Sequence, residues 1–217
     1  MPVKSTEYAL SISGLTKTYG DVIAVNDLSI DIYQGETLGF FGPNGAGKTT
    51  TVNVICGLLA ADAGEVSIHC KSLVDDYHQC KRLLGFCPQE VVFWEALTCM
   101  EQLTSVGRFY DLDNKTTRAR ANKLLEVMRL VDQRNRLGGT LAGGMKRRLN
   151  IALALVHEPL VLILDEPQAG LDSRGEVAGG LLTRPPGVYP SERGCPAHCK
   201  NLWRSGKRQV HDGGRIL

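Results

Sequence analysis

The sequence predicts an α/β fold with a parallel sheet. Residues 37–41 and 161–164 are short, continuously apolar runs, as expected of strands that are covered on both faces. A helix-like stretch follows the first run, from Lys48 to Leu58, and another precedes the second run, from Gly143 to Leu155. This alternation of strand and helix is typical of α/β proteins, and 217 residues suffice for one such domain.

A second kind of β structure is predicted at the start of the chain. Residues 8–12 and 28–32 alternate apolar and polar side chains, which is the pattern of half-buried strands. A turn is predicted at residues 34–36, just before the apolar run 37–41. We therefore expect an antiparallel β part, followed by a buried strand that leads directly into Gly42.

Residues 90 to about 140 predict a mainly helical insert. Thr98 and Glu101 have the spacing of a capping box ahead of one helix. Apolar residues recur at helical spacing in a second helix, at Ala121, Leu124, Leu125 and Met128. Because such periodicity reports burial, we assign these positions to the core and give them no chemical role.

Composition excludes some classes of protein. A formal charge of +2 is too small to indicate a nucleic-acid or membrane-surface partner. No apolar run approaches the roughly 20 residues that a membrane-spanning helix needs, and the first residues lack the apolar core of a signal peptide. We therefore expect no membrane span and seven cysteines that stay reduced, and the set Cys195, His198 and Cys199 lacks the further paired ligands of a zinc site.

The segment 42–49 has the sequence GPNGAGKT, which matches the phosphate-loop pattern of two glycines, lysine and a hydroxyl residue. Glycines let backbone N–H groups and a helix N-terminus face phosphate oxygens. Lys48 can reach the β and γ phosphates, and the Thr49 hydroxyl can bind Mg²⁺. The predicted ATP contacts here are Gly42, Pro43, Asn44, Gly45, Ala46, Gly47, Lys48, Thr49 and Thr50.

Two carboxylates follow the apolar run 161–164. Open α/β sheets bind ligands at the carboxyl ends of their strands, where Asp165 and Glu166 are expected to lie. Asp165 is predicted to hold Mg²⁺, directly or through water, and Glu166 to act as the general base on the attacking water. Lys48, through its contact with the transferred phosphate, is predicted to be catalytic together with Glu166.

Other segments resemble the nucleotide-binding subunits of ABC transporters. Residues 141–148, LAGGMKRR, resemble the signature motif of that family, which normally begins LSGG. Residues 86–89, FCPQ, resemble its Q-loop, and residues 169–172, AGLD, resemble its D-loop. Tyr19 matches the aromatic residue that stacks on adenine, a contact that rests on ring-on-ring packing.

The resemblance implies a RecA-like P-loop NTPase core, with an N-terminal antiparallel β subdomain and a helical ABC-specific subdomain. It implies one ATP-binding cassette over residues 1–217. Residues 8–89 and 150–175 would form the core with the β subdomain, residues 90–149 the helical subdomain, and residues 176–217 an atypical tail.

The resemblance also implies roles and partners. Gln89 would contact Mg²⁺ or the attacking water, while Ala142, Gly143, Gly144 and Asp172 would complete the ATP site of a facing cassette. Two cassettes would sandwich ATP and drive a membrane-spanning permease, most similar to exporters. Such a chain would lie on the inner face of the cell membrane, in the cytoplasm. The alternatives are a catalytically impaired ATP-binding paralogue, and an ATPase acting on DNA or ribosomes, which would carry tandem cassettes or a coiled coil.

The chain departs from the family pattern in two places. Ala142 replaces the signature serine, so the hydroxyl that would bond the γ-phosphate is missing. After Asp172, glycines and prolines interrupt the expected helix and strand, no strand precedes His198, and family character returns only at residues 212–217. We hypothesise two compensating frame shifts that affect roughly residues 176–210.

The basic run Lys146, Arg147 and Arg148 offers positive charge that could contact nucleic acid. Three charges on one helical turn are more typical of a solvated or phosphate-facing surface. We therefore predict no nucleic-acid partner and a solvated or phosphate-facing surface for this run.

Overall fold

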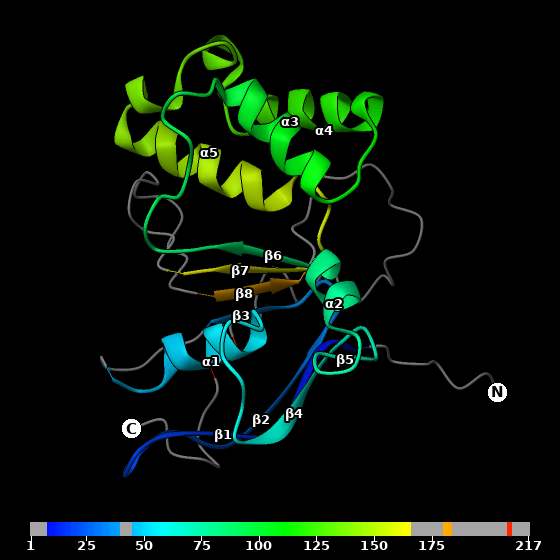
Figure 1. Cartoon of the computed structure of the whole chain (residues 1–217), viewed down its shortest axis with the longest axis vertical. Helices are drawn as coiled ribbons and strands as arrows, with labels where there is room; N and C mark the ends of the chain where they lie inside the picture. The colour runs from blue at the N-terminus through cyan, green and yellow to red at the C-terminus, as the bar shows by residue number, and fades with distance from the viewer. Residues whose placement is uncertain (1–7, 40–44, 166–179, 184–207, 210–217) are drawn as a thin grey trace, which may run out of the picture.

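The computed structural model describes residues 8–39, 45–165, 180–183 and 208–209, and in the last two segments it describes the backbone alone. Figure 1 shows three helices, α3, α4 and α5, above a sheet that contains β6, β7, β8 and β3. Helix α1 and a second sheet with β1, β2 and β4 lie below. The fold is therefore layered, and helices cover both faces of the sheet that carries the predicted site.

The lower sheet is antiparallel, as predicted for the start of the chain. It has the strand order β2-β1-β4-β5, and its first two strands pair in a register that sets Leu10 opposite Ile32. The pairing continues much further than the alternating pattern indicated. The strand bounds are β1 Tyr8–Tyr19, β2 Val22–Tyr33, β4 Ala63–Ile68 and β5 Lys71–Ser72.

The upper sheet has the order β6-β7-β8-β3-β9. Its strands are β3 Thr37–Gly39, β6 Leu84–Cys87, β7 Val161–Leu164, β8 Gly180–Thr183 and β9 Arg208–Gln209. β6 pairs with β7 in parallel and β3 with β9 in parallel, whereas β8 runs antiparallel to both β7 and β3. The sheet is thus mixed and not parallel as the sequence predicts, because β8, the central strand, runs antiparallel to its two neighbours.

The expectation that glycine and proline leave no strand after Asp172 is wrong at β8. Leu181 and Leu182 each pair on both sides, with β7 and with β3. A four-residue strand between two formed neighbours gains ladder hydrogen bonds on both edges, which outweighs its weak local propensity. β8 therefore occupies the position between β7 and β3, and the sheet is continuous there.

The helices begin and end close to the predicted positions. Thr98 and Glu101 form both hydrogen bonds of the predicted capping box, and Ala121, Leu124 and Leu125 are buried in the helix that follows. The bounds are α1 Lys48–Ile55, α2 Tyr77–Leu83, α3 Cys99–Phe109, α4 Asn114–Val127 and α5 Gly143–Leu155, with 3₁₀ turns at Val131–Gln133 and Gly138–Thr140. The predicted boundary between residues 149 and 150 falls inside α5.

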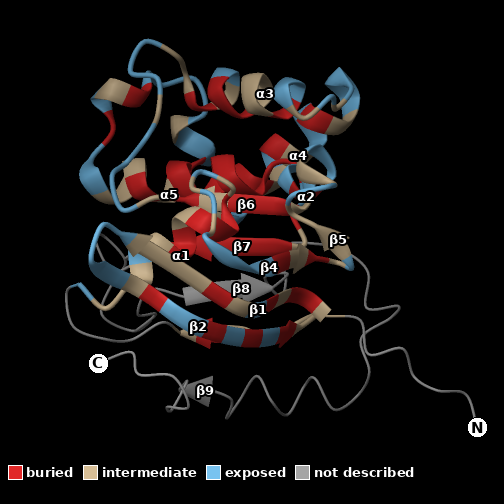
Figure 2. Cartoon of the chain, turned by 60° about the horizontal axis from the view of Figure 1, so that its bottom comes forward, coloured by how far each residue is buried: buried red, intermediate tan, exposed pale blue. Residues whose placement is uncertain are grey.

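Two hydrophobic clusters form the core, and β7 joins them. Val161 and Ile163 belong to the cluster around α1 and the lower sheet, while Leu162 and Leu164 belong to the cluster around α3, α4 and α5. Successive side chains of a strand point to opposite faces, so a strand covered on both sides is apolar throughout. Figure 2 shows β7 and most of β6 and α5 as buried.

Within the described ranges, every helix is too short or too polar to cross a lipid bilayer.

Candidate nucleotide site

The register of the upper sheet brings the predicted site segments to one edge. Gly39 of β3 lies opposite Gly180 of β8, which in turn lies opposite Leu164 of β7, and Leu164 lies opposite Cys87 of β6. These four residues form one row across the sheet. β3, β6 and β7 all end at this row. The segments that follow them, with the phosphate loop, Gln89 and Asp165, therefore begin at the same edge of the sheet.

Strand spacing sets the scale of this arrangement. Neighbouring strands lie about 4.8 Å apart, so β6 and β7 are adjacent and β3 is roughly 10 Å from β7. The backbone of Asp165 is fixed here, because its N–H donates to the Cys87 carbonyl over 3.0 Å. The predicted metal residue Asp165 is half-buried, and Gln89 is exposed.

The described part of the phosphate loop, residues 45–50, leads into the N-terminus of α1. Gly45 and Gly47 have φ angles of 84° and 78°, a region that favours glycine. A Cβ on Gly47 would lie 2.1 Å from the Ala24 carbonyl oxygen, so no larger residue fits. The first turn of α1 has no acidic side chain, so no carboxylate of that turn offsets the positive end of the helix dipole.

This geometry fits a phosphate ligand and a magnesium ion. A glycine turn at a helix N-terminus is an anion site, and Lys48 at the first helical position adds positive charge. Mg²⁺ is usually held by one or two carboxylates together with substrate phosphates. The exposed Thr49 hydroxyl and the Asp165 carboxylate are suitable donors, although the described residues contain no cluster of three acidic, His or Cys ligands.

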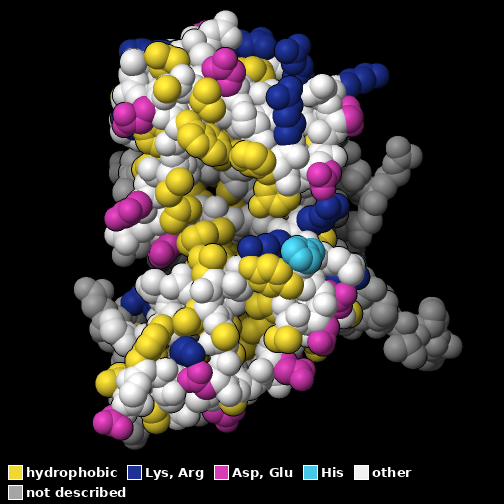
Figure 3. Space-filling model, in the orientation of Figure 1, with side chains coloured by type: hydrophobic (Ala, Val, Ile, Leu, Met, Phe, Trp, Pro, Cys, Tyr) yellow, Lys and Arg dark blue, Asp and Glu magenta, His cyan; other side chains and the backbone are white. Residues whose placement is uncertain are grey.

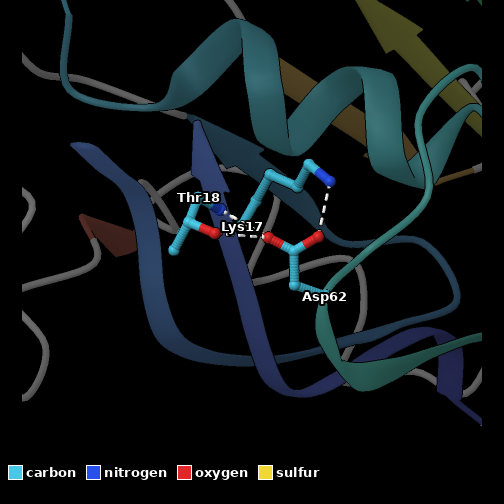
Figure 4. Close-up of polar contacts among 3 residues, drawn as sticks. All are labelled: Lys17, Thr18 and Asp62. Carbon is cyan, nitrogen blue, oxygen red and sulfur yellow. Dashed lines mark hydrogen bonds and ion pairs between the residues drawn. The ribbon is translucent and has the colours of Figure 1, made fainter. Parts of the chain in front are cut away.

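Tyr19, the predicted adenine contact, lies at the end of β1 and is 51% exposed. A polar cluster fixes the strand beside it (Figure 4): Asp62 accepts from Lys17 Nζ at 2.6 Å, and from the Thr18 N–H and hydroxyl at 2.7 and 2.8 Å. These hydrogen bonds lower the pKa of Asp62 to about 2. Lys17 Nζ also lies 5.9 Å from the centre of the Tyr19 ring.

The predicted signature residues lie at the start of α5. Ala142 is the N-cap, with an extended backbone and no side-chain hydrogen bond to the helix. Ala142 and Gly143 are exposed, and no atom of the described residues lies within 4 Å of the position that a Cβ on Gly143 would occupy. The packing of the described chain therefore does not require a glycine at this position.

The prediction that the basic run 146–148 forms a solvated or phosphate-facing surface is wrong for Arg147, which is 0% exposed. Its guanidinium donates to the carbonyls of Pro88, Gln89 and Asp165. Charge counting along the sequence missed this role. The burial of Arg147 could have been suspected from its spacing to Asn150. Two residues three positions apart lie on one face of a helix, and both side chains are buried on that face of α5.

A cavity of about 510 Å³ opens between α2, α3 and α5. It is lined by Leu58, Val92 and Trp94, which are 63%, 63% and 44% exposed, and by Lys81, Tyr110 and His157. Figure 3 shows hydrophobic side chains gathered on this face between the helical layer and the sheets. Such a concentration of exposed apolar surface is typical of an interaction site.

Several predicted site residues lie outside the described ranges. These are Gly42, Pro43, Asn44, Glu166 and Asp172. Cys195, His198 and Cys199, to which no site is assigned, lie outside the described ranges as well.

The described cysteines are all free thiols. Burial raises the pKa of Cys56 to about 12 and that of Cys87 to about 11, so both thiols stay protonated near neutral pH.

A strand that leads to a glycine loop and helix, in one sheet with a buried strand that is followed by Asp165, defines a P-loop nucleotide-binding protein. The chain belongs to the ABC transporter family, whose model matches residues 25–169. This confirms the resemblance that the motifs indicated.

Two similar proteins are named for drug resistance. The chain is 37% identical over 163 residues to the linearmycin resistance ATP-binding protein LnrL of Bacillus subtilis, covering 75% of this chain and 52% of LnrL. It is 38% identical over 178 residues to the doxorubicin resistance ATP-binding protein DrrA of Mycobacterium tuberculosis, covering 81% and 54%. The chain thus spans about half the length of these relatives.

Solved structures agree on the fold. An ATP-binding subunit of an ABC transporter matches with a TM-score of 0.70 and 31% identity, over 76% of this chain and 69% of that chain. An ATP-binding cassette in its ADP conformation matches with a TM-score of 0.65 and 28% identity, over 76% and 71%. The α/β cassette fold with its antiparallel β part and helices is therefore confirmed.

Proposed function

We propose that this chain binds Mg-ATP at the row of strand ends and hydrolyses it to power an ABC exporter. The observation that carries the proposal is the register of the upper sheet. It places the ends of β3, β6 and β7, which lead to the phosphate loop, Gln89 and Asp165, at one edge of the sheet. Backbone N–H groups of the loop and Lys48 would hold the phosphates, while Tyr19 would stack on the base. ATP would supply the phosphoryl group that is transferred to water.

The metal and the general base complete the proposed site. Thr49, Asp165 and Gln89 would face Mg²⁺, which would neutralise charge on the phosphate oxygens. Glu166, the residue after Asp165, would accept the proton of the attacking water. The half-buried position of Asp165 and its fixed backbone support a metal-binding role.

We infer that the active form is a pair of cassettes. Ala142, Gly143, Gly144 and Asp172 would contact the ATP of the facing cassette. The support is that Ala142 and Gly143 are exposed at a helix N-terminus, where N–H groups favour an anion. The open space around Gly143 would leave room for close approach by a phosphate.

We infer that the apolar cavity is the docking site for a permease. Trp94, Val92 and Leu58 would be covered by an apolar segment of that membrane-spanning partner, which would place the chain at the inner face of the cell membrane. The two relatives named for drug resistance support an exporter. If a permease encoded beside the gene is co-expressed, Trp94→Glu should abolish co-purification, and its retention would exclude this surface.

A specific observation favours the alternative of a catalytically impaired subunit. Ala142 offers no hydroxyl to a γ-phosphate, and one hydrogen bond to a charged group is worth roughly 1.5–3 kcal/mol. An impaired chain would still bind ATP, because the phosphate loop is intact in sequence.

Turnover of the purified chain decides between the two functions. With Mg²⁺ present, the wild type is expected to release phosphate, and Glu166→Gln should lower kcat by roughly 100-fold or more while ATP binding persists. ATP binding without turnover in the wild type would support the impaired subunit instead.

A further inference from the structure

Arg147 of α5 is a charged side chain inside the core. It is 0% exposed, and the cluster around it contains Leu141, Leu149 and Ile151. A guanidinium in such a place is costly unless hydrogen bonds compensate for its lost hydration. Its bonds therefore indicate what the residue does.

The guanidinium bridges two segments of the proposed magnesium site. Nη1 donates to the Pro88 carbonyl and, over 3.3 Å, to the Gln89 carbonyl. Nη2 donates to the Asp165 carbonyl over 2.7 Å. One side chain thus fixes the backbone after β6 and the backbone after β7 at the same time.

The same side chain connects these segments to the helix that begins at Ala142. Arg147 lies in the second turn of α5, whose first turn contains Gly143 and Gly144. Three residues further on, Asn150 Nδ2 donates to the Cys87 Sγ over 3.4 Å, so the same helix face lies on the end of β6. Movement of α5 would therefore carry the Gln89 and Asp165 backbones with it.

We propose that Arg147 is a positioning residue that couples the signature helix to the magnesium-facing backbone. The proposal rests on the proposed ATPase function. Arg147 contacts neither nucleotide nor metal; it sets the positions of Gln89 and Asp165, and these set the affinity for Mg²⁺ in the presence of ATP. Lysine cannot replace it, because one ammonium lacks the planar fork that reaches three carbonyls.

The first experiment measures ATP binding with excess EDTA and then titrates Mg²⁺ against turnover. For Arg147→Lys we expect ATP affinity without Mg²⁺ to change less than about 2-fold, since the phosphate loop is untouched. We expect the Mg²⁺ concentration for half-maximal turnover to rise at least about 5-fold and kcat to fall about 10-fold, as for loss of outer-shell support to a metal.

Arg148→Lys is the matched control. Arg148 lies next to Arg147, and its guanidinium also donates to carbonyls, those of Met128, Arg129 and Gly144, but none of these belongs to the segments after β6 and β7. It should leave the Mg²⁺ requirement at the wild-type value. An equal rise in both variants, or none in Arg147→Lys, would overturn the proposal.

Hydrogen exchange tests the same inference without turnover. In Arg147→Lys, the Asp165 amide, bonded to Cys87, should exchange faster, while amides of α3 and α4 keep their wild-type rates. Unchanged exchange at Asp165 would overturn the coupling whether or not the wild type hydrolyses ATP. If the wild type shows no turnover but the Asp165 amide still exchanges faster in Arg147→Lys, the proposed ATPase function is refuted and the proposed coupling stands.

Discussion

At the scale of single residues, Ala142 connects helix stability with the proposed chemistry. It occupies the N-cap of α5, where serine, threonine or aspartate would accept a hydrogen bond from the first helical turn. The family's serine would serve both as cap and as phosphate ligand. Alanine removes the two contributions together, so a substitution must separate them.

Ala142→Ser is expected to raise both stability and turnover. The new cap should add about 1 kcal/mol to the free energy of unfolding, measured by urea denaturation. The hydroxyl should raise kcat, measured as phosphate release at saturating Mg-ATP. Ala142→Asp is the control, because it caps the helix but places a negative charge near phosphate, so it should gain stability without turnover. Equal turnover in wild type and Ala142→Ser would contradict a role for the hydroxyl.

His157 makes stability depend on pH. Its ring stacks on Tyr110 with centroids 3.7 Å apart, and its Nε2–H donates to the Leu84 carbonyl. Burial lowers the pKa of His157 from 6.5 to about 4, with a smaller contribution from Arg120. The folded protein therefore holds this ring neutral where the unfolded chain would protonate it.

This contribution to stability should be complete above about pH 6.5 and should disappear as the pH falls toward 4. The linkage predicts a loss of about 2 kcal/mol between pH 7.5 and 5, measured by urea unfolding. His157→Phe keeps an aromatic ring against Tyr110 and should remove this part of the pH dependence. An unchanged slope in that variant would assign the effect to other groups.

At the scale of elements, the contact between α5 and β6 determines how the site is supported. A Cβ on Gly85 would lie 2.4 Å from the Ala154 carbonyl oxygen and 2.8 Å from Pro159. Glycine in β6 thus lets the helix backbone approach the strand closely. Since Arg147 reaches across from the same helix, the distance between α5 and β6 also affects Gln89 and Asp165.

Gly85→Ala should push α5 away from β6. Overpacking of this kind costs about 1–3 kcal/mol, which urea unfolding would measure, and kcat should fall with it. Gly139→Ala serves as the control, because its nearest neighbour would be a side-chain atom of Glu95 at 3.2 Å. If Gly85→Ala loses no more stability than the control, α5 can move to accommodate the added methyl group without a measurable cost.

At the scale of the whole molecule, β8 completes the sheet on which the site depends. It pairs with β7 and β3, and so it holds the row from Gly39 to Cys87 together. Yet it comes from the stretch 176–210, where the sequence loses its family character. The structure gives this strand a direction opposite to both neighbours.

Reading the nucleotide sequence of the gene would test that hypothesis. Two compensating shifts should appear as an alternative frame over roughly residues 176–210 that encodes a helix, an apolar strand and a histidine. A single open frame with no such alternative would refute the hypothesis. Residues 180–183 would then be the native sequence of the strand between β7 and β3.

The sequence alone determined the elements whose signals are local. The glycine loop before Lys48, the capping box at Thr98 and the apolar run ending at Leu164 depend on backbone conformation and on burial of neighbours in the chain. These features fixed the family and the predicted site residues.

Only the tertiary structure decided which distant groups meet. The reversed β8, the burial of Arg147 against carbonyls 59, 58 and 18 positions away, and the cavity beside Trp94 depend on how helices pack on the sheet. A charge such as that of Arg147 favours water in isolation, and it is buried here because three carbonyls at the ends of β6 and β7 replace that water. Neither periodicity nor composition contains those long-range contacts.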